Sequence, residues 1–305
     1  MNPLAATMAR GLSWNVVDDV HELLALHFMV NAFRAGTIVA VVAGAMGWFM
    51  VLRRQSFAGH TLAVVSFPGA AGAVWIGLSA TIGYFAASIA AALVIALVPH
   101  SGSREDGESS AIIGTVQALA LASGVLFVSL YGGFLNGLNG LLFGTFLGIS
   151  DDQVITLVVV GVAVLVLLAI IGRPLFFATV DADVAEARGV RVRLLSVVFL
   201  VMLGCAAAEV SQITGTLLVF ALLVLPAASA QRLTARPAAS FVLTIVLAVS
   251  IMWAALSVAY FSIYPIGFFV TTFGMAVFVT AAAWRALVDR LQQRGRVRHL
   301  GGAFT

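Results

Sequence analysis

Long apolar runs, separated by short polar segments, dominate the chain from end to end. Each run is close to the roughly 20 residues that a helix needs to cross the hydrocarbon core of a bilayer. The runs cover residues 31–52, 61–79, 82–99, 111–131, 153–172, 194–209, 213–230, 238–259 and 268–284. This pattern predicts an all-α polytopic membrane protein with about nine transmembrane helices.

Three segments follow from this pattern. Residues 1–30 form an amphipathic lead-in that precedes the first run, 31–284 form the transmembrane domain, and 285–305 form a basic tail. Within the transmembrane domain, 132–150 is apolar but interrupted by glycines, which indicates a re-entrant or interfacial hairpin. In the lead-in, Asp18, His21 and Glu22 share one helical face with His27 beyond them, and this face is either a divalent-metal site or simply solvated.

The composition supports a membrane protein and excludes most soluble enzymes. The chain is 62% hydrophobic and 10% charged, with a mean hydropathy of +1.10, which leaves no room for a large aqueous domain. All 16 basic residues are arginine. Because a phosphate-binding P-loop needs a lysine, any ATP that drives this protein must bind to another chain. The single Cys205 excludes an internal disulfide.

The arginines also predict the orientation, because basic residues concentrate on the cytoplasmic side of a membrane. Nine spans place the two ends of the chain on opposite sides. With the C-terminus in the cytoplasm, 14 of the 16 arginines are cytoplasmic, and only Arg10 and Arg34 lie outside. We therefore predict that the N-terminus is outside and the C-terminus is cytoplasmic.

The longest cytoplasmic connector between spans, 173–193, has the composition of a short helix. Asp181, Asp183 and Glu186 come early, Gly189 follows as a helix stop, and arginines come last. Acidic residues at the start and basic residues at the end suit a helix dipole. A short cytoplasmic helix of this kind would suit the docking of a motor subunit, and an ordinary charged loop is the alternative.

Few ionisable groups fall within the spans, and such groups are functional candidates. His60 begins the second run and faces either the cytoplasm or a central pathway. Glu209 ends the sixth run, where an interfacial position explains it best. Pro68 and Pro226 lie deep in two runs, each followed by small residues that allow close helix approach. Their similar contexts suggest a weak inverted repeat, as found in many transporters.

An ordered set of motifs resembles the metal-type permease family of ATP-binding-cassette importers, the membrane subunits of zinc, manganese and iron uptake systems. The motifs, in order, are F-M-V-N-A-F-R-A-G (Phe28 to Gly36), V-L-R-R (Val51 to Arg54), A-x-x-S-F-P-G-A-A-G-A (Ala63 to Ala73), L-F-G-T-F-L-G-I-S (Leu142 to Ser150), D-A-D-V-A-E-A-R-G-V (Asp181 to Val190), G-T-L-L-V-F-A-L-L-V-L-P-A-A-S-A (Gly215 to Ala230) and Y-P-I-G (Tyr264 to Gly267). In order and spacing they cover almost all of the chain after residue 27.

The resemblance implies a multi-pass permease in the plasma (inner) membrane of a prokaryote, with no cofactor of its own and no covalent chemistry. It implies pairing as a homodimer or with a second permease, a cytoplasmic ATP-binding subunit, and an external substrate-binding protein. The segment of about 180–190 becomes a coupling helix that contacts the ATPase. Its expected coupling residues are Asp181, Asp183, Ala185, Glu186, Ala187 and Gly189.

The translocation pathway expected from the resemblance departs from the family pattern. The family usually carries an Asp and, one turn later, a His, where this chain has His60 and Val64. His60 remains the single candidate metal ligand, with Val64, Pro68, Pro226 and Glu209 as further pathway residues. The predicted cargo is a divalent transition metal. A metal chelate or non-metal cargo on the same fold is the alternative, followed by an ATP-independent secondary transporter.

Overall fold

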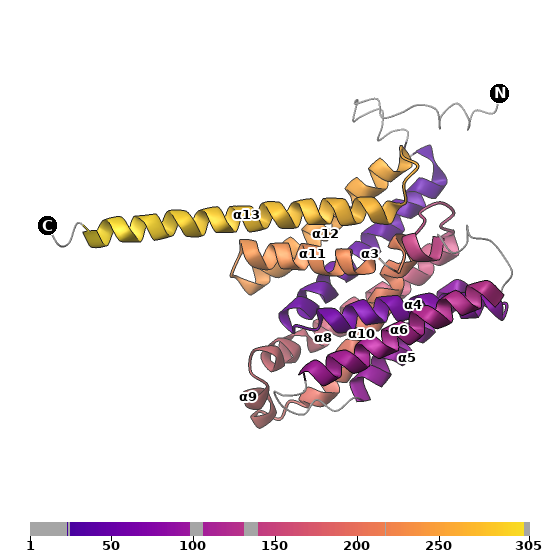
Figure 1. The fold of residues 1–305 in the computed structure, drawn as a ribbon, viewed down its shortest axis with the longest axis horizontal. Helices are drawn as coiled ribbons and strands as arrows, with labels where there is room; N and C mark the ends of the chain where they lie inside the picture. Colours follow the sequence, from indigo (N-terminus) through magenta and orange to yellow (C-terminus); the bar gives the residue numbers. More distant parts are fainter. Residues whose placement is uncertain (1–22, 24, 98–105, 131–139, 217, 302–305) are drawn as a thin grey trace.

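The chain folds as a bundle of helices. A computed structural model describes residues 23, 25–97, 106–130, 140–216 and 218–301. The helices are α3 (His27–Leu52), α4 (Ser56–Trp75), α5 (Ala80–Leu97), α6 (Asp106–Leu130), α8 (Asp151–Val180), α9 (Ala182–Ala187), α10 (Val192–Thr214), α11 (Val219–Leu233), α12 (Pro237–Tyr260) and α13 (Ile266–Gly301). Each predicted apolar run overlaps a different helix (Figure 1), so the all-helical class is confirmed.

Among the described residues, seven helices are long and apolar enough to cross a membrane: α3, α4, α5, α8, α10, α12 and α13 as far as Gln292. Two shorter apolar helices, Gly114–Leu130 within α6 and Val219–Leu233, complete the set. The first 22 residues of the lead-in and residues 132–139 of the predicted hairpin lie outside the described residues. Asp18, His21 and Glu22 are among them.

The core lies around α3 and α10. The middle of α3, from Val39 to Met50, is almost wholly buried, and so is the second half of α10. Both helices are apolar nearly all round, as expected for helices surrounded by others. In contrast, α8 exposes a stripe of large apolar side chains, among them Ile155, Val159 and Val166. Such a stripe suits contact with lipid.

The α8 helix is longer than its apolar run predicts. Ser150 caps its start, because the Ser150 Oγ atom accepts a hydrogen bond of 3.2 Å from the Gln153 N–H. The run suggests an end near residue 172, but the helix continues through Pro174 to Val180. Leu175 and Ala178 are buried, and this packing supports the helix beyond the proline.

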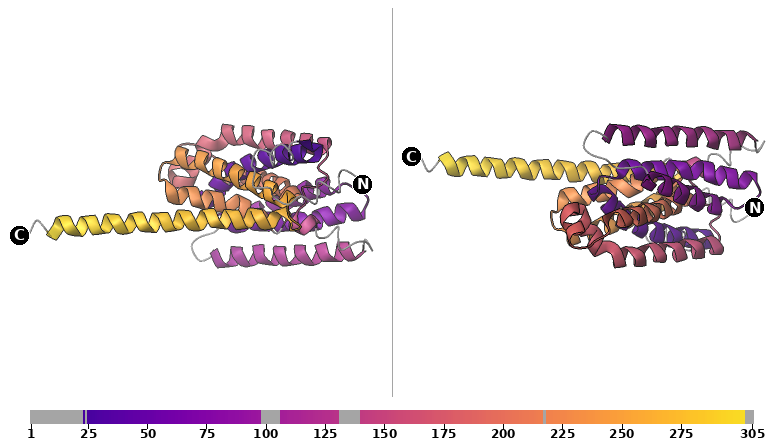
Figure 2. Two further views of the ribbon diagram at one scale, coloured as in Figure 1. Left: turned by 90° about the horizontal axis from the view of Figure 1, so that it is seen from above. Right: turned by 90° about the horizontal axis from the view of Figure 1, so that it is seen from below.

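The two ends of the bundle differ. The start of α3 lies at one end, whereas α9 lies at the other, and the last part of α13 leaves the bundle on the α9 side (Figures 1 and 2). Helix α13 is continuous over 36 residues, so the predicted boundary at 285 falls inside a helix. An exposed Arg285–Asp289 ion pair of 3.2 Å follows that boundary.

Candidate functional site

His60 lies in the second turn of α4, at a point where three helices meet. Its Nε2 atom is 3.2 Å from the Gln117 Nε2 atom of α6. Its ring packs edge-on against the Phe220 ring of α11, with the ring centroids 5.3 Å apart. The side chain is therefore turned into the bundle, between α6 and α11.

The hydrogen bonds of His60 leave one ring nitrogen unused. Gln117 also contacts Thr61, whose Oγ1 atom lies 3.4 Å from the Gln117 Oε1 atom. Because a hydroxyl donates or accepts, either orientation of the Gln117 amide satisfies the His60 Nε2 atom. The His60 Nδ1 atom is buried and has no hydrogen-bond partner among the described residues. A neutral imidazole held in this way has one lone pair or one N–H free for a passing ligand.

The next two turns of α4 offer no second side-chain ligand. Val64 is 1% exposed and apolar, and Pro68 is buried inside the helix. Pro68 has no N–H, so the usual helical hydrogen bond to the Val64 carbonyl is absent. The Val64 carbonyl is thus available as an oxygen donor, and residues 60–68 contain no carboxylate.

Pro226 has the same effect in α11. It is buried inside that helix, and its missing N–H removes the usual bond to the Leu222 carbonyl. Phe220, which contacts His60, lies six residues earlier on the same helix. Helices α4 and α11 pack against each other, so the two proline-containing helices are neighbours, joined through the contact between His60 and Phe220.

Glu209 is separate from this group. Ser211 of α10 faces α4, because its Oγ atom lies 3.0 Å from the Ser66 Oγ atom. Two residues correspond to about 200° around a helix, so Glu209 points away from α4. A Cβ atom built on Gly161 of α8 would lie 3.5 Å from the Glu209 Oε1 atom, which places the carboxyl group beside α8. The structure therefore does not bring Glu209 together with His60.

The environment of Glu209 is also more enclosed than its position near the end of an apolar run indicated. Its side chain is 0% exposed, and neither carboxyl oxygen has a hydrogen-bond partner among the described residues. The reason is that α10 continues to Thr214, so that Glu209 lies more than one turn inside the helix. Glu209 is therefore enclosed by neighbouring helices, while its depth relative to the membrane interface stays a prediction.

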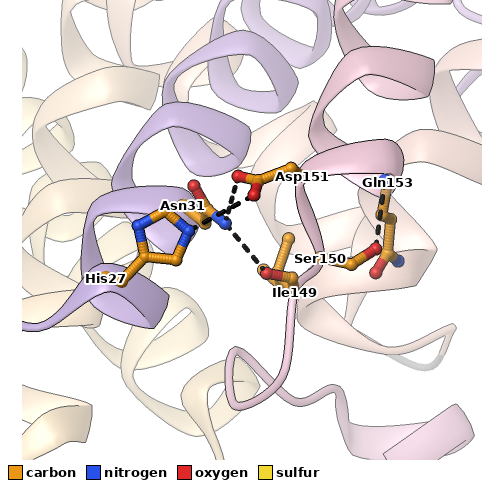
Figure 3. Close-up of polar contacts among 6 residues, drawn as sticks. All are labelled: His27, Asn31, Ile149, Ser150, Asp151 and Gln153. Atoms are coloured by element: carbon orange, nitrogen blue, oxygen red, sulfur yellow. Dashed lines mark hydrogen bonds and ion pairs between the residues drawn. The ribbon is translucent and has the colours of Figure 1, made fainter.

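A polar cluster at the opposite end of the bundle was missed in the sequence (Figure 3). Asn31 of α3 is 1% exposed and donates from Nδ2 to the Asp151 Oδ1 atom at 2.9 Å and to the Ile149 carbonyl at 3.2 Å. His27 Nε2 lies 3.3 Å from the Asp151 Oδ2 atom, and both side chains are largely exposed. The cluster joins the starts of α3 and α8. Its one sequence signal is the polar Ser150–Gln153 segment, which caps α8.

Helix α9 is short, exposed and capped at both ends. The Asp181 Oδ1 atom accepts a hydrogen bond of 3.0 Å from the Val184 N–H, as an N-cap does. At the other end Gly189 has φ of +83°, the Gly189 N–H donates to the Glu186 carbonyl, and the Val190 N–H donates to the Ala185 carbonyl. This is a Schellman ending.

The six expected coupling residues lie in or next to α9. Ala185 is buried and anchors the helix, whereas the others are exposed to solvent: Asp181, Asp183, Glu186, Ala187 and Gly189.

Among the described residues, no group of three or more His, Cys, Asp or Glu side chains is placed to hold a metal ion. A cation in the region of His60 would therefore rely on the imidazole, carbonyl oxygens and water.

A sequence model of the ABC 3 transport family matches residues 25–285. The chain belongs to this family. An ABC 3 permease is a multi-pass membrane protein that transports rather than catalyses, and the described helices agree with that architecture.

Individual relatives of this ABC 3 permease are transport proteins of bacteria. The manganese import system permease protein ScaB of Streptococcus parasanguinis is 29% identical over 215 residues, which is 70% of this chain and 75% of the relative. The chelated iron transport system membrane protein YfeC of Yersinia pestis is 32% identical over 211 residues, covering 69% and 70%. The solved structure of PsaBC from Streptococcus pneumoniae in complex with Fab superposes with a TM-score of 0.78 at 25% identity, covering 87% of this chain and 95% of that chain.

Proposed function

We propose that this ABC 3 permease imports a divalent transition metal, manganese or iron in the first place and zinc as a further candidate, past His60. The single observation that carries this proposal is the buried His60 Nδ1 atom, which has no protein partner among the described residues. Imidazole nitrogen is a ligand that suits these metals. The names of the manganese and iron relatives support the same cargo class.

The pathway that we infer runs between the two proline-containing helices, α4 and α11. Pro68 and Pro226 free the Val64 and Leu222 carbonyls from their usual bonds, and carbonyl oxygens are acceptable metal ligands at membrane depth when they line a polar path. His60 would hold the ion only weakly, which suits an ion that must leave again. Val64 would contribute its carbonyl and an apolar wall.

ATP hydrolysis would reach this pathway through α9. We place α9 in the cytoplasm against a separate ATPase, with the start of α3 outside, because most arginines lie on the α9 side of the predicted topology. Asp181, Asp183 and Glu186 give α9 an acidic face for a basic groove on the ATPase. A second permease copy and an external substrate-binding protein would complete the importer, as the resemblance implies.

A second cargo remains a candidate, because one imidazole is a poor site for a bare metal ion. Val64 supplies no side-chain ligand, and no cluster of three metal-binding side chains occurs in the described part of the chain. A metal chelate needs fewer protein ligands, and one relative is named as a chelated iron transporter.

Reconstitution separates these possibilities. The permease, its ATPase and its binding protein would be placed in proteoliposomes and supplied with Mn²⁺, Fe²⁺, Zn²⁺ or the same metals as chelates. ATP-dependent uptake of a free ion supports the proposal, and uptake of chelates alone supports the second candidate. Uptake that needs no ATPase and follows a proton gradient contradicts both and indicates a secondary transporter.

A further inference from the structure

Arg53 joins three separate parts of the chain at the α9 end of the bundle. It is the first residue after α3, in the short corner that leads to α4. Its Nη1 atom donates to the Thr179 Oγ1 atom at 3.2 Å, and its Nη2 atom donates to the Ser196 Oγ atom at 2.9 Å. The guanidinium also lies over the Phe199 ring, 5.2 Å from the centroid.

These partners lie in α8 and α10, the two helices that flank α9 in the chain. Thr179 lies in the last turn of α8, just before α9 begins at Ala182, whereas Ser196 and Phe199 lie in the first two turns of α10. The Thr179 hydroxyl donates to the Leu175 carbonyl at 2.6 Å, so its lone pairs face Arg53. One planar guanidinium therefore links the end of α8 to the start of α10, on either side of α9 in the chain.

The corner that carries Arg53 is tight. The Arg54 N–H donates to the Val51 carbonyl and the Gln55 N–H donates to the Met50 carbonyl, while Arg54 has φ of +56°, which is uncommon for a residue with a Cβ. The Arg53 Nε atom donates to the Gln55 Oε1 atom at 3.3 Å. Movement of Arg53 must therefore move the start of α4, and His60 follows about 6 Å further along that helix.

We propose that Arg53 is the positioning residue through which movement of α9 reaches α4 and His60 during transport. This inference rests on the proposed function of α9 as the contact with the ATPase. The described polar partners of Arg53 are neutral, so no salt bridge has to break when the end of α8 and the start of α10 move. In this role Arg53 would act only through the helices that it joins, without needing contact with cargo or nucleotide.

The test measures ATP-driven movement of α4 directly, in the assembled complex with its ATPase. Phe57, at the start of α4, is 44% exposed. In a Cys205→Ala background, Phe57→Cys provides one thiol, and its labelling rate is compared without nucleotide and with ATP plus vanadate. This readout does not depend on which cargo is carried.

Arg53→Met removes all three side-chain hydrogen bonds of Arg53. We expect it to reduce the ATP-dependent change in labelling by about tenfold or more, since one charge-assisted hydrogen bond alone accounts for a factor of that order. Arg53→Lys should restore part of it. Thr179→Val with Ser196→Ala removes the acceptors and keeps Arg53, so it should reproduce the defect even if Arg53→Met fails to fold. Arg54→Asn is the matched control, because it removes a neighbouring charge and tolerates positive φ.

Two results would overturn the inference. One is an unchanged labelling response in Arg53→Met or in the acceptor double variant, with the ATPase still bound. The other is loss of the ATPase from the purified Arg53→Met complex, which would make Arg53 an assembly residue. Uptake of Mn²⁺, Fe²⁺ and Zn²⁺ by the parent complex is measured in parallel. If none of the three ions is taken up while the labelling response is intact, the proposed cargo is refuted and the role of Arg53 stands.

Discussion

His60 and Gln117 lie 3.2 Å apart across α4 and α6, and this contact sets which imidazole nitrogen is free. Replacing Gln117 by Leu removes that constraint while the imidazole remains. We expect Gln117→Leu to lower kcat/KM for uptake by about tenfold, as for other groups that orient a metal ligand. His60→Gln should lose more, because it removes the ligand itself. Uptake is measured in proteoliposomes containing the ATPase.

Thr61→Val is the matched control for the Gln117 variant. It removes the bond of 3.4 Å to Gln117 and the bond of 3.1 Å from the Thr61 hydroxyl to the Phe57 carbonyl of the same helix. The contact between His60 and Gln117 remains, so the effect on uptake should be smaller than that of Gln117→Leu. Equal uptake by His60→Gln and the parent would show that the cargo does not pass this imidazole.

The cargo class can be tested by rebuilding the family pattern. His60→Asp combined with Val64→His places a carboxylate and an imidazole one turn apart on α4. We expect the double variant to bind Mn²⁺ more tightly, with KM for Mn²⁺ uptake lower by roughly tenfold for one added ligand worth about 1.4 kcal/mol. Because Val64 is buried, the larger side chain should also destabilise the protein by about 1–3 kcal/mol.

Val64→Leu together with His60→Asp is the control, since it overfills the same space without a second ligand. If this control lowers KM as much as the double variant does, the carboxylate alone accounts for the gain. No change in either variant would favour a chelate as cargo.

Gly189 ends α9 with φ of +83°, and nothing lies within 4 Å of a Cβ built there. Gly189→Ala therefore causes backbone strain without a clash, at a cost of about 1 kcal/mol. Because the strain falls on the Schellman ending, we expect a looser α9, weaker binding to the ATPase and lower ATP-dependent uptake. Binding is measured by titrating the purified ATPase onto the permease in nanodiscs.

Gly189→Asn should retain most of the binding, because Asn tolerates the left-handed region better than Ala does. Equal losses in both variants would point to the side chain itself blocking the ATPase surface rather than to strain in α9.

The helices could be predicted from the sequence, whereas the contacts between them could not. A run of about 20 apolar residues suffices to indicate a spanning helix, and Asp181 and Gly189 mark the ends of α9 through their own cap chemistry. The partners of His60 and Arg53 lie far along the chain, at Gln117, Thr179 and Ser196. Such pairs depend on how the helices pack, which apolar periodicity does not specify.

Glu209 also shows that the sequence does not specify how the helices pack. Its position near the end of an apolar run indicated an interface, but the length of α10 and the close approach of Gly161 place its carboxyl group inside the bundle. A polar group buried without a partner costs about 1–3 kcal/mol. We therefore expect Glu209→Gln to leave stability unchanged or raise it, and Glu209→Leu to raise it by about 1 kcal/mol. Thermal unfolding in detergent measures both.

A loss of several degrees in the Tm of Glu209→Leu would show that the carboxyl group has a stabilising partner, such as a bound cation. Uptake by Glu209→Gln is measured alongside. Because Glu209 points away from α4, ATP-driven uptake should fall far less than in His60→Gln. If Glu209→Gln loses as much uptake as His60→Gln does, Glu209 lies on the same translocation pathway as His60.

Asn31 and Asp151 hold the starts of α3 and α8 together at the end of the bundle opposite α9. Asn31 is buried, and both of its Nδ2 hydrogen bonds cross to the α8 side. Asn31→Ala should destabilise the protein by roughly 2–3 kcal/mol, because the Ile149 carbonyl loses a donor and a small cavity forms.

Asn31→Asp should destabilise the protein more than Asn31→Ala does, since two carboxylates then face each other. Exchanging the pair, Asn31→Asp with Asp151→Asn, restores one donor and one acceptor, and its Tm should lie above that of Asn31→Asp alone. If the exchange gives no recovery, the bond to Ile149 rather than the contact with Asp151 holds the two helices together.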